Sequence, residues 1–182
     1  MSVTTSTCRI RRADEADTPA LQRIEFDAAR RYGSVEETCF CLDLPVRSIK
    51  EHQYARNQGL ALVVETEDMP VGFVLVIPTD NHAHILEIAV SVEHQGRGYG
   101  RALIKAAEEW ASHRGFHEIS LTTFRDVTWN APFYRRLGYE EFQAGPDRVD
   151  LRELIAQEKA AGVHAAPRVA MRKMLSPKTA LF

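Results

Sequence analysis

Three closely spaced glycines separate an apolar run from a helical pattern. The run Ile85 to Val92 is rich in β-branched residues, Gly96, Gly98 and Gly100 follow it, and Arg101 to Arg114 has apolar residues at helical spacing. This order predicts a strand, a tight turn and a helix, whose first backbone N–H groups lack partners. Such N–H groups attract phosphate, and glycines let a diphosphate approach the backbone closely. The turn is therefore a candidate phosphate-binding site.

The spacing of these glycines distinguishes the turn from two common phosphate-binding motifs. A Walker loop requires Gly-Lys followed by Ser or Thr, and no such pair follows the glycines. A dinucleotide fingerprint counted from Gly96 meets Arg101 where the third glycine belongs, and Glu118 precedes the next strand instead of ending it. A glycine turn without a ligand is the remaining structural alternative. Arg97 and Arg101 would add positive charge for an anionic ligand.

The hexapeptide Gln95-Gly96-Arg97-Gly98-Tyr99-Gly100 resembles the Q/R-x-x-G-x-G/A signature of the GNAT superfamily of N-acetyltransferases. The resemblance implies that acetyl-CoA is the donor substrate and that this turn binds its pyrophosphate. It also implies that the preceding strand offers backbone groups to the pantetheine arm. The cofactor-binding residues expected on this basis are Ile88, Ala89, Val90, Gln95, Gly96, Arg97, Gly98, Tyr99, Gly100 and Arg101.

A second segment, Trp129 to Tyr139, is similar to the N-x-x-A-x-x-F-Y-x-x-x-G-F region of the same family. By this resemblance Tyr134 would protonate the departing CoA thiolate, and Phe133 and Asn130 would contact CoA. Asn130 lies four residues before Tyr134, whereas the family's asparagine lies seven before its tyrosine. Tyrosine packing at a helix start is the structural alternative for Tyr134.

Acetyl transfer to an amine requires a base, because an alkyl amine with a pKa near 10 is protonated at neutral pH and exposing its lone pair costs about 4 kcal/mol. Glu87 resembles the strand glutamate that accepts this proton in some family members, and partial burial would raise its pKa. A surface glutamate is the alternative. By the same resemblance, the backbone N–H of Ala89 or Val90 would stabilise the oxyanion. No paired nucleophile and base is evident, so we expect direct attack of the amine in a ternary complex.

The acceptor is less well defined than the donor. Glu36, Glu37 and Asp43 lie in the segment that would border the acceptor entrance, where they would favour a cationic amine or simply face solvent. Arg125 would instead suit an acceptor that carries a carboxylate. These residues do not decide between a small-molecule amine and a peptide or protein amine.

The elements around these segments predict an α/β fold with a mixed central sheet flanked by helices. Strands are expected at 8–12, 60–65, 71–77, 85–92, 118–124, 139–142 and 168–175, and helices at 14–31, 46–57, 101–114, 132–137 and 147–161. The resemblance to the GNAT fold spans Cys8 to about Leu175. The helix at 147–161 is an addition to that fold, and its apolar stripe would cover the acceptor site or pair with a second subunit as a homodimer.

The composition bounds the remaining possibilities. The 182 residues suit one domain, with a core at about 8–175 and a tail at 176–182. The net charge of −2 argues against a nucleic-acid partner, and the longest apolar stretch, Met69 to Pro78, is too short to cross a membrane. The start of the chain shows no signal-peptide pattern, so we expect a cytoplasmic protein.

Cysteines and histidines complete the candidates for chemistry. Cys8, Cys39 and Cys41 form no C-x-x-C pair and are expected to be reduced, mostly buried thiols. His82 and His84 flank a predicted turn without neighbouring ligands, so we expect surface imidazoles and no metal. Two other functions stay open: a CoA-binding regulator without turnover, and a nicotinamide or nucleotide enzyme.

Overall fold

A mixed seven-stranded sheet forms the centre of the computed structural model, which describes residues 8–163 and 166–176. The strands are β1 (Cys8–Arg12), β2 (Leu60–Thr66), β3 (Met69–Thr79), β4 (His82–Val90), β5 (Glu118–Phe124), β6 (Glu140–Phe142) and β7 (Arg168–Met174), in the spatial order β1-β2-β3-β4-β5-β7-β6. Only the β4–β5 pair is parallel. The predicted α/β class with a mixed sheet is confirmed.

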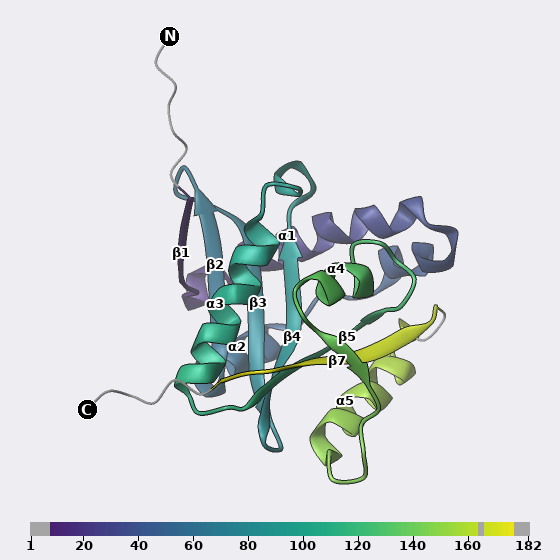
Figure 1. The fold of residues 1–182 in the computed structure, drawn as a ribbon. Coiled ribbons are helices and arrows are strands. Elements are labelled where there is room, and N and C mark those ends of the chain that lie inside the picture. The colour runs from purple at the N-terminus through teal and green to yellow at the C-terminus, as the bar shows by residue number, and fades with distance from the viewer. Residues whose placement is uncertain (1–7, 164–165, 177–182) are drawn as a thin grey trace, which may run out of the picture.

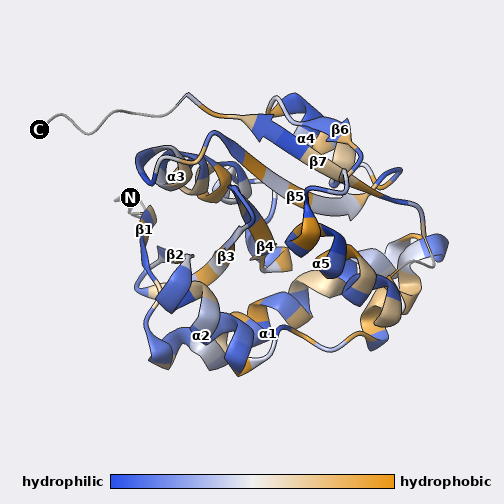
Figure 2. Ribbon diagram, turned by 90° about the horizontal axis from the view of Figure 1, so that it is seen from below, coloured by the Kyte–Doolittle hydropathy of each residue, from blue (hydrophilic) through white to orange (hydrophobic). Residues whose placement is uncertain are grey.

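Helices cover both faces of this sheet (Figures 1 and 2). They are α1 (Thr18–Ala29), α2 (Ile49–Gln58), α3 (Tyr99–His113), α4 (Ala131–Arg136) and α5 (Val149–Ala160), joined by short 3₁₀ helices at Glu15–Asp17, Arg30–Ser34, Glu36–Asp43 and Val92–His94. In Figure 2, α3 lies on one side of the sheet and α1 and α2 on the other. Leu103 and Ile104 of α3 pack into one core, and Leu21 and Ile24 of α1 into the second. β2 is buried along its whole length because both its faces are covered.

β4 and β5 separate after a short parallel ladder. Their pairing covers Ala83–Ile119, His84–Ser120 and Ile85–Leu121, whereas β4 continues to Val90 and β5 to Phe124. Past these pairs, each strand turns one backbone edge toward the gap. β7 lies between β5 and β6 in the sheet, although it follows β6 in the sequence.

α2 begins with a capping box that bears on the site. The Ser48 side chain accepts a hydrogen bond from the Glu51 N–H (3.3 Å), and the Glu51 carboxylate accepts one from the Ser48 N–H (2.7 Å). Arg47, directly before this cap, is thereby held where its side chain can reach β4. Sequence alone placed the helix start at 46 and therefore included this arginine in the helix.

Two predictions about reactive side chains are wrong. His82 and His84 are 4% and 2% exposed, because β4 is a central strand with neighbours on both edges and helices over its faces. The His84 Nδ1 lies 2.8 Å from the Ser120 hydroxyl. Cys8 and Cys39 are exposed and only Cys41 is buried, since Cys8 starts an edge strand and Cys39 lies on the outer side of a 3₁₀ helix.

Smaller differences concern element ends. The extra helix begins at Val149 with Arg148 as its N-cap, not at Asp147. The segment expected to be a loop or broken helix at 32–45 forms 3₁₀ turns. Most of the predicted tail lies outside the described residues. Among the described residues, no helix has the length and hydrophobicity needed to span a bilayer.

Candidate active site

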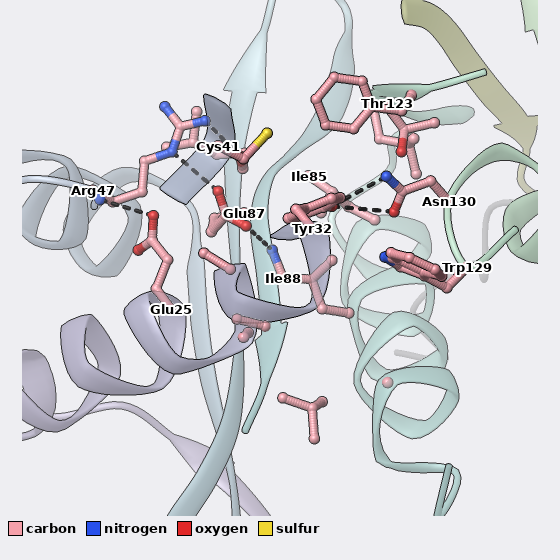
Figure 3. Close-up of a pocket in the computed structure, with 18 of the residues that line it drawn as sticks. Glu25, Tyr32, Cys41, Arg47, Ile85, Glu87, Ile88, Thr123, Trp129 and Asn130 are labelled. Atoms are coloured by element: carbon pink, nitrogen blue, oxygen red, sulfur yellow. Dashed lines mark hydrogen bonds and ion pairs between the residues drawn. The ribbon is translucent and has the colours of Figure 1, made fainter. Parts of the chain in front are cut away.

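A cavity of about 780 Å³ opens where β4 and β5 separate. α1, β4, β5, α4, α5 and the turn at 95–101 all contribute to its lining. All the predicted site residues except Arg97 line this one cavity. Figure 3 shows its interior with Glu25, Glu87 and Arg47 close together on one side and Tyr32, Trp129 and Asn130 on the other.

A β-bulge turns Glu87 into the cavity. Leu75 pairs with Glu87 but Val76 pairs with Ile85, so Leu86 is an extra residue in β4. Side chains alternate along a regular strand, and an extra residue reverses that alternation. Ile85 and Ile88 therefore both pack on the α3 face, while Glu87 faces the opposite side together with His84. Sequence spacing alone does not reveal this reversal.

Glu87 lies in a partly buried cluster of charges. Its Oε2 is 3.4 Å from the Arg47 Nε, and its Oε1 accepts a hydrogen bond from the Ile88 N–H (3.2 Å). Burial raises the pKa of Glu87, and the Arg47 charge opposes that effect. Glu25, on α1, accepts a hydrogen bond from the Arg47 backbone N–H (2.9 Å). Burial and the nearby Glu87 charge raise the pKa of Glu25 to about 9, so Glu25 is protonated at neutral pH.

Arg47 organises these carboxylates. Its Nη1 donates to Glu51 (2.9 Å) and its Nη2 to the Leu86 carbonyl (3.1 Å). The arginine thus joins the start of α2 to the bulged residue of β4 and lies beside Glu87. A guanidinium held this way fixes the orientation of the Glu87 carboxylate.

The glycine turn presents unpaired backbone N–H groups. Gly96 and Gly98 have φ of 75° and 86°, and Gly98 is the N-cap of α3. The first hydrogen bond of α3 runs from the Ala102 N–H to the Gly98 carbonyl (3.0 Å), so the N–H groups of Tyr99, Gly100 and Arg101 precede the helical ladder. A Cβ added at Gly96, Gly98 or Gly100 would meet no atom within 4 Å. The turn is therefore open to a diphosphate.

The charges around this turn differ from the predicted ones. Arg101 lines the cavity, but the Arg97 Nη2 donates to the Glu93 carbonyl (3.1 Å) and Arg97 does not line it. Arg31, from the 3₁₀ helix after α1, is next to the turn instead. Its Nη1 donates to the Gln95 Oε1 (2.9 Å), and its guanidinium lies 4.1 Å from the centroid of the Trp129 ring.

The backbone of β4 offers donors to the gap at alternate residues. The Ser91 N–H donates to the Val71 carbonyl of β3 (2.9 Å). Ala89, two residues before Ser91, is the partner of Phe73 in β3 and turns its backbone groups the same way. In an antiparallel ladder the residues between such pairs turn their N–H and C=O groups the other way. Ile88 and Val90 therefore face the gap, and the Val90 carbonyl accepts a hydrogen bond from the Gln95 side chain (2.9 Å). The Ala89 N–H faces β3.

Tyr134 lies on α4 with its ring buried against other aromatic residues. Its ring centroid is 5.3 Å from that of Phe133 and 5.7 Å from that of Tyr139. Burial raises the pKa of Tyr134 well above its usual range, so the group is a neutral phenol at physiological pH. In the described part of the chain, its hydroxyl has no hydrogen-bond partner, and Tyr134 lines the cavity.

Asn130 joins the two sides of the cavity instead of standing free. Its amide nitrogen donates to the Tyr32 hydroxyl (3.1 Å), which lies 3.3 Å from the amide oxygen (Figure 3). Tyr32 also packs against Phe124 and Trp129 at ring centroid distances of 5.5 and 6.0 Å. The segment after α1 is thus attached to the start of α4 across the opening.

Glu36, Glu37 and Asp43 are exposed and do not line the cavity, which agrees with the alternative that they face solvent. Arg125 pairs with Glu141 outside the cavity. The charged lining residues at the acceptor end are Glu25, Arg47, Glu51, Glu87, Glu158 and Arg168. Glu25, Arg47 and Arg168 gave no signal in the sequence, because single charged residues in amphipathic segments are usually solvated. α5 covers the cavity within the same chain, with Leu154, Gln157 and Glu158 in its lining.

The described residues contain no group of three or more His, Cys, Asp or Glu side chains placed to hold a metal ion.

Comparison with known proteins identifies the family. Residues 22–139 match the model of the Acetyltransferase (GNAT) family. An uncharacterised N-acetyltransferase of Methanocaldococcus jannaschii is 37% identical over 93 residues, which are 47% of this chain and 41% of that protein. N-acetyltransferase family 8 member 3 of Rattus norvegicus is 24% identical over 117 residues, which are 61% of this chain and 51% of that protein. The matches thus span about half the length of these relatives or less.

Solved structures share the fold at low sequence identity. The ribosomal-protein-S18-alanine N-acetyltransferase of Escherichia coli has a TM-score of 0.65 at 19% identity, covering 97% of this chain and 99% of that one. The PaiA N-acetyltransferase of Thermoplasma acidophilum, solved in complex with coenzyme A, has a TM-score of 0.65 at 16% identity, covering 92% and 99%. With its mixed sheet, its separated β4 and β5 and its glycine turn at the start of α3, this chain belongs to the GNAT family of N-acetyltransferases, which are acyltransferases.

Proposed function

We propose that this protein transfers an acetyl group from acetyl-CoA directly to a primary amine. The observation that supports this most strongly is the row of unpaired N–H groups at 99–101, open to a diphosphate, in the same cavity as the half-buried carboxylate of Glu87. The turn would bind the pyrophosphate, and the backbone of Ile88 and Val90 would bind the pantetheine arm in the gap between β4 and β5. Arg31 and Arg101 would add positive charge beside the phosphates.

Glu87 is the proposed base. It would take a proton from the acceptor ammonium, directly or through a water molecule, and release it to solvent. The amine nitrogen then forms a bond to the thioester carbonyl carbon. The Val90 N–H faces the gap and is the proposed donor to the oxyanion, in place of the Ala89 N–H, which faces β3.

Tyr134 is the proposed acid. As the C–S bond breaks, its phenol would give a proton to the sulfur, and the second proton lost by the nitrogen would restore it. A thiol with a pKa of about 8.5 is already a fair leaving group, so this transfer would contribute less than the base. No residue of the chain becomes acetylated in this scheme.

A panel of primary amines, assayed by release of free CoA thiol, tests the proposal together with calorimetry of acetyl-CoA binding. The expected result is acetyl-CoA binding in the micromolar range and CoA release that depends on one or more amines. A protein that binds acetyl-CoA but releases no CoA with any amine would be a CoA-binding regulator. A protein stabilised by NAD or ATP and not by CoA would be a nucleotide enzyme.

A further inference from the structure

Arg168 is a largely buried cation at the acceptor end of the cavity. Its side chain is 19% exposed, it lines the cavity, and its guanidinium lies 4.8 Å from the centroid of the Phe124 ring. Burying a guanidinium is unfavourable unless its N–H groups find acceptors. The hydrogen bonds of Arg168 therefore indicate whether it only stabilises the fold or also has donors free for a ligand.

Most of the donors on Arg168 are unused. Its Nη2 donates to the Thr122 hydroxyl (2.9 Å) and to Glu158 of α5 (3.1 Å). Its Nε is buried without a hydrogen-bond partner, and its Nη1 has none either among the described residues. An arginine carries five N–H groups, so a network built only to attach α5 would leave three of them unpaired, and the one on Nε is buried from solvent.

Arg168 and Glu87 face the cavity from opposite sides of β5. Arg168 pairs with Phe124, and Ala170 pairs with Thr122, so Arg168, Phe124 and Thr122 share one face of the sheet. The bulge at Leu86 turns Glu87 to that same face. β5 lies between β4 and β7, which places the two backbones about 10 Å apart or more. Both side chains are long, so a small group bound between them can contact both.

We propose that the acceptor is an α-amino acyl group, in which Glu87 binds the ammonium and Arg168 donates a hydrogen bond to the carbonyl or carboxylate oxygen on the neighbouring carbon. This rests on the proposed function and names its acceptor class. A plain alkyl amine leaves the free donors of Arg168 unpaired. A polyamine brings a second ammonium toward a guanidinium. Both are therefore poorer acceptors.

Glu158 bears on whether the acyl group of the acceptor is a neutral carbonyl or a charged carboxylate. Because its carboxylate shares the Arg168 Nη2 with Thr122, it offsets the guanidinium charge without using the Nη1 donors. A neutral carbonyl, as in a peptide N-terminus, then binds more favourably than the full negative charge of a free amino acid. The shared chemistry is the α-amino acyl group, and its two sources are distinguished by experiment.

The test compares acceptors that share one side chain. L-Leucinamide and isoamylamine differ in structure by the carboxamide alone. Because the carboxamide also lowers the pKa of the neighbouring ammonium from about 10 to about 8, kcat/KM from CoA release is expressed per concentration of unprotonated amine for each acceptor. The wild type should prefer leucinamide by about tenfold or more. Arg168→Met should bring this ratio toward one. Arg172→Met is the matched control: Arg172 lies on the same face of β7, pairs with Glu140 and Glu118 outside the cavity, and should leave the ratio unaltered.

A second variant guards against misfolding of Arg168→Met. Glu158→Gln removes the offsetting charge and should raise kcat/KM for free L-leucine relative to leucinamide by about tenfold. In the wild type, a peptide that begins with Leu and free leucine show which source is used, and either order keeps the α-amino acyl class.

Three results would overturn the inference. The wild type could show equal kcat/KM for leucinamide and isoamylamine, or it could prefer isoamylamine. A folded Arg168→Met variant could also keep the wild-type ratio of kcat/KM for leucinamide to that for isoamylamine. Failure of the proposed function has a different signature, since no acceptor would then release CoA, whether or not acetyl-CoA binds.

Discussion

Replacing Gly98 with alanine should separate the fold from ligand binding. Gly98 has a φ of 86°, a conformation that costs a residue with a Cβ about 1–2 kcal/mol. The added Cβ would meet no protein atom within 4 Å, so no packing penalty adds to this strain. For a chain of this size, about 1 kcal/mol lowers the melting temperature by roughly 2–4 °C. The variant should therefore stay folded.

Acetyl-CoA binding should suffer more than stability does. The empty space beside Gly98 is where the proposal puts the diphosphate, so the methyl group should raise the Kd for acetyl-CoA at least about tenfold, or 1.4 kcal/mol. Gly115→Ala is the matched control, because Gly115 has a φ of 83°, equally open surroundings and a place at the far end of α3. It should lose the same stability and keep its affinity.

A third variant, Gly100→Ala, should not lose stability as Gly98→Ala and Gly115→Ala do. Gly100 lies in the first turn of α3 without a positive φ, so Gly100→Ala should leave the free energy of unfolding unchanged or raise it by up to about 1 kcal/mol, while still weakening acetyl-CoA binding. Thermal unfolding of the ligand-free protein and isothermal calorimetry measure the two quantities. The reasoning is refuted if Gly98→Ala binds acetyl-CoA as the wild type does, or if Gly115→Ala loses as much affinity as Gly98→Ala.

Other variants address single roles. Glu87→Gln should lower kcat by about 10²–10⁴-fold at neutral pH, and the deficit should shrink as the pH approaches the pKa of the acceptor ammonium, about 8 for an α-amino group and about 10 for an alkyl amine, where no base is needed; parallel pH–rate profiles would exclude the base role. Tyr134→Phe should lower kcat by roughly ten to a few hundredfold with little change in the Kd for acetyl-CoA, and full activity would assign Tyr134 to packing. Arg31→Ala should weaken acetyl-CoA binding about tenfold but not alter KM for S-acetylpantetheine, which lacks the diphosphate; equal effects on both would make Arg31 structural. His52 is buried with neither ring nitrogen paired, so His52→Leu should raise stability by about 1–2 kcal/mol in thermal unfolding. Burial lowers the pKa of His52, so wild-type stability is lost as the pH falls below about 6.5, and the gain should grow there; a constant gain would refute this.

The elements and the donor end of the site were predictable because they depend on local patterns. The spacing of the glycines between a β-branched run and an amphipathic helix is enough to predict the turn. The start of α3 lies within two residues of its predicted position. The sequence also singled out Glu87, which lines the cavity, but not the reason why it faces that side of the sheet. The bulge at Leu86 is a register shift between two strands, and neither strand alone encodes it.

The acceptor end depends on contacts between distant segments. Glu25, Arg47 and Arg168 come from three elements far apart in sequence and meet only in the folded chain. His84 was expected at the surface because a turn seemed near, whereas its burial follows from the central place of β4 in the sheet. Arg31 took the position expected of Arg97, whose side chain donates to the Glu93 carbonyl instead.

The place of β7 between β5 and β6 has a consequence for biosynthesis. β6 leaves the ribosome before the strand that bonds it to the rest of the sheet, and at about 5–20 residues per second the delay is of the order of seconds. During that interval β6 has no strand to pair with, and α5 has its contacts to β5 but not the one that Glu158 makes with Arg168. A chain that ended in this interval would contain the glycine turn but lack Arg168, and with it the proposed contact to the acceptor.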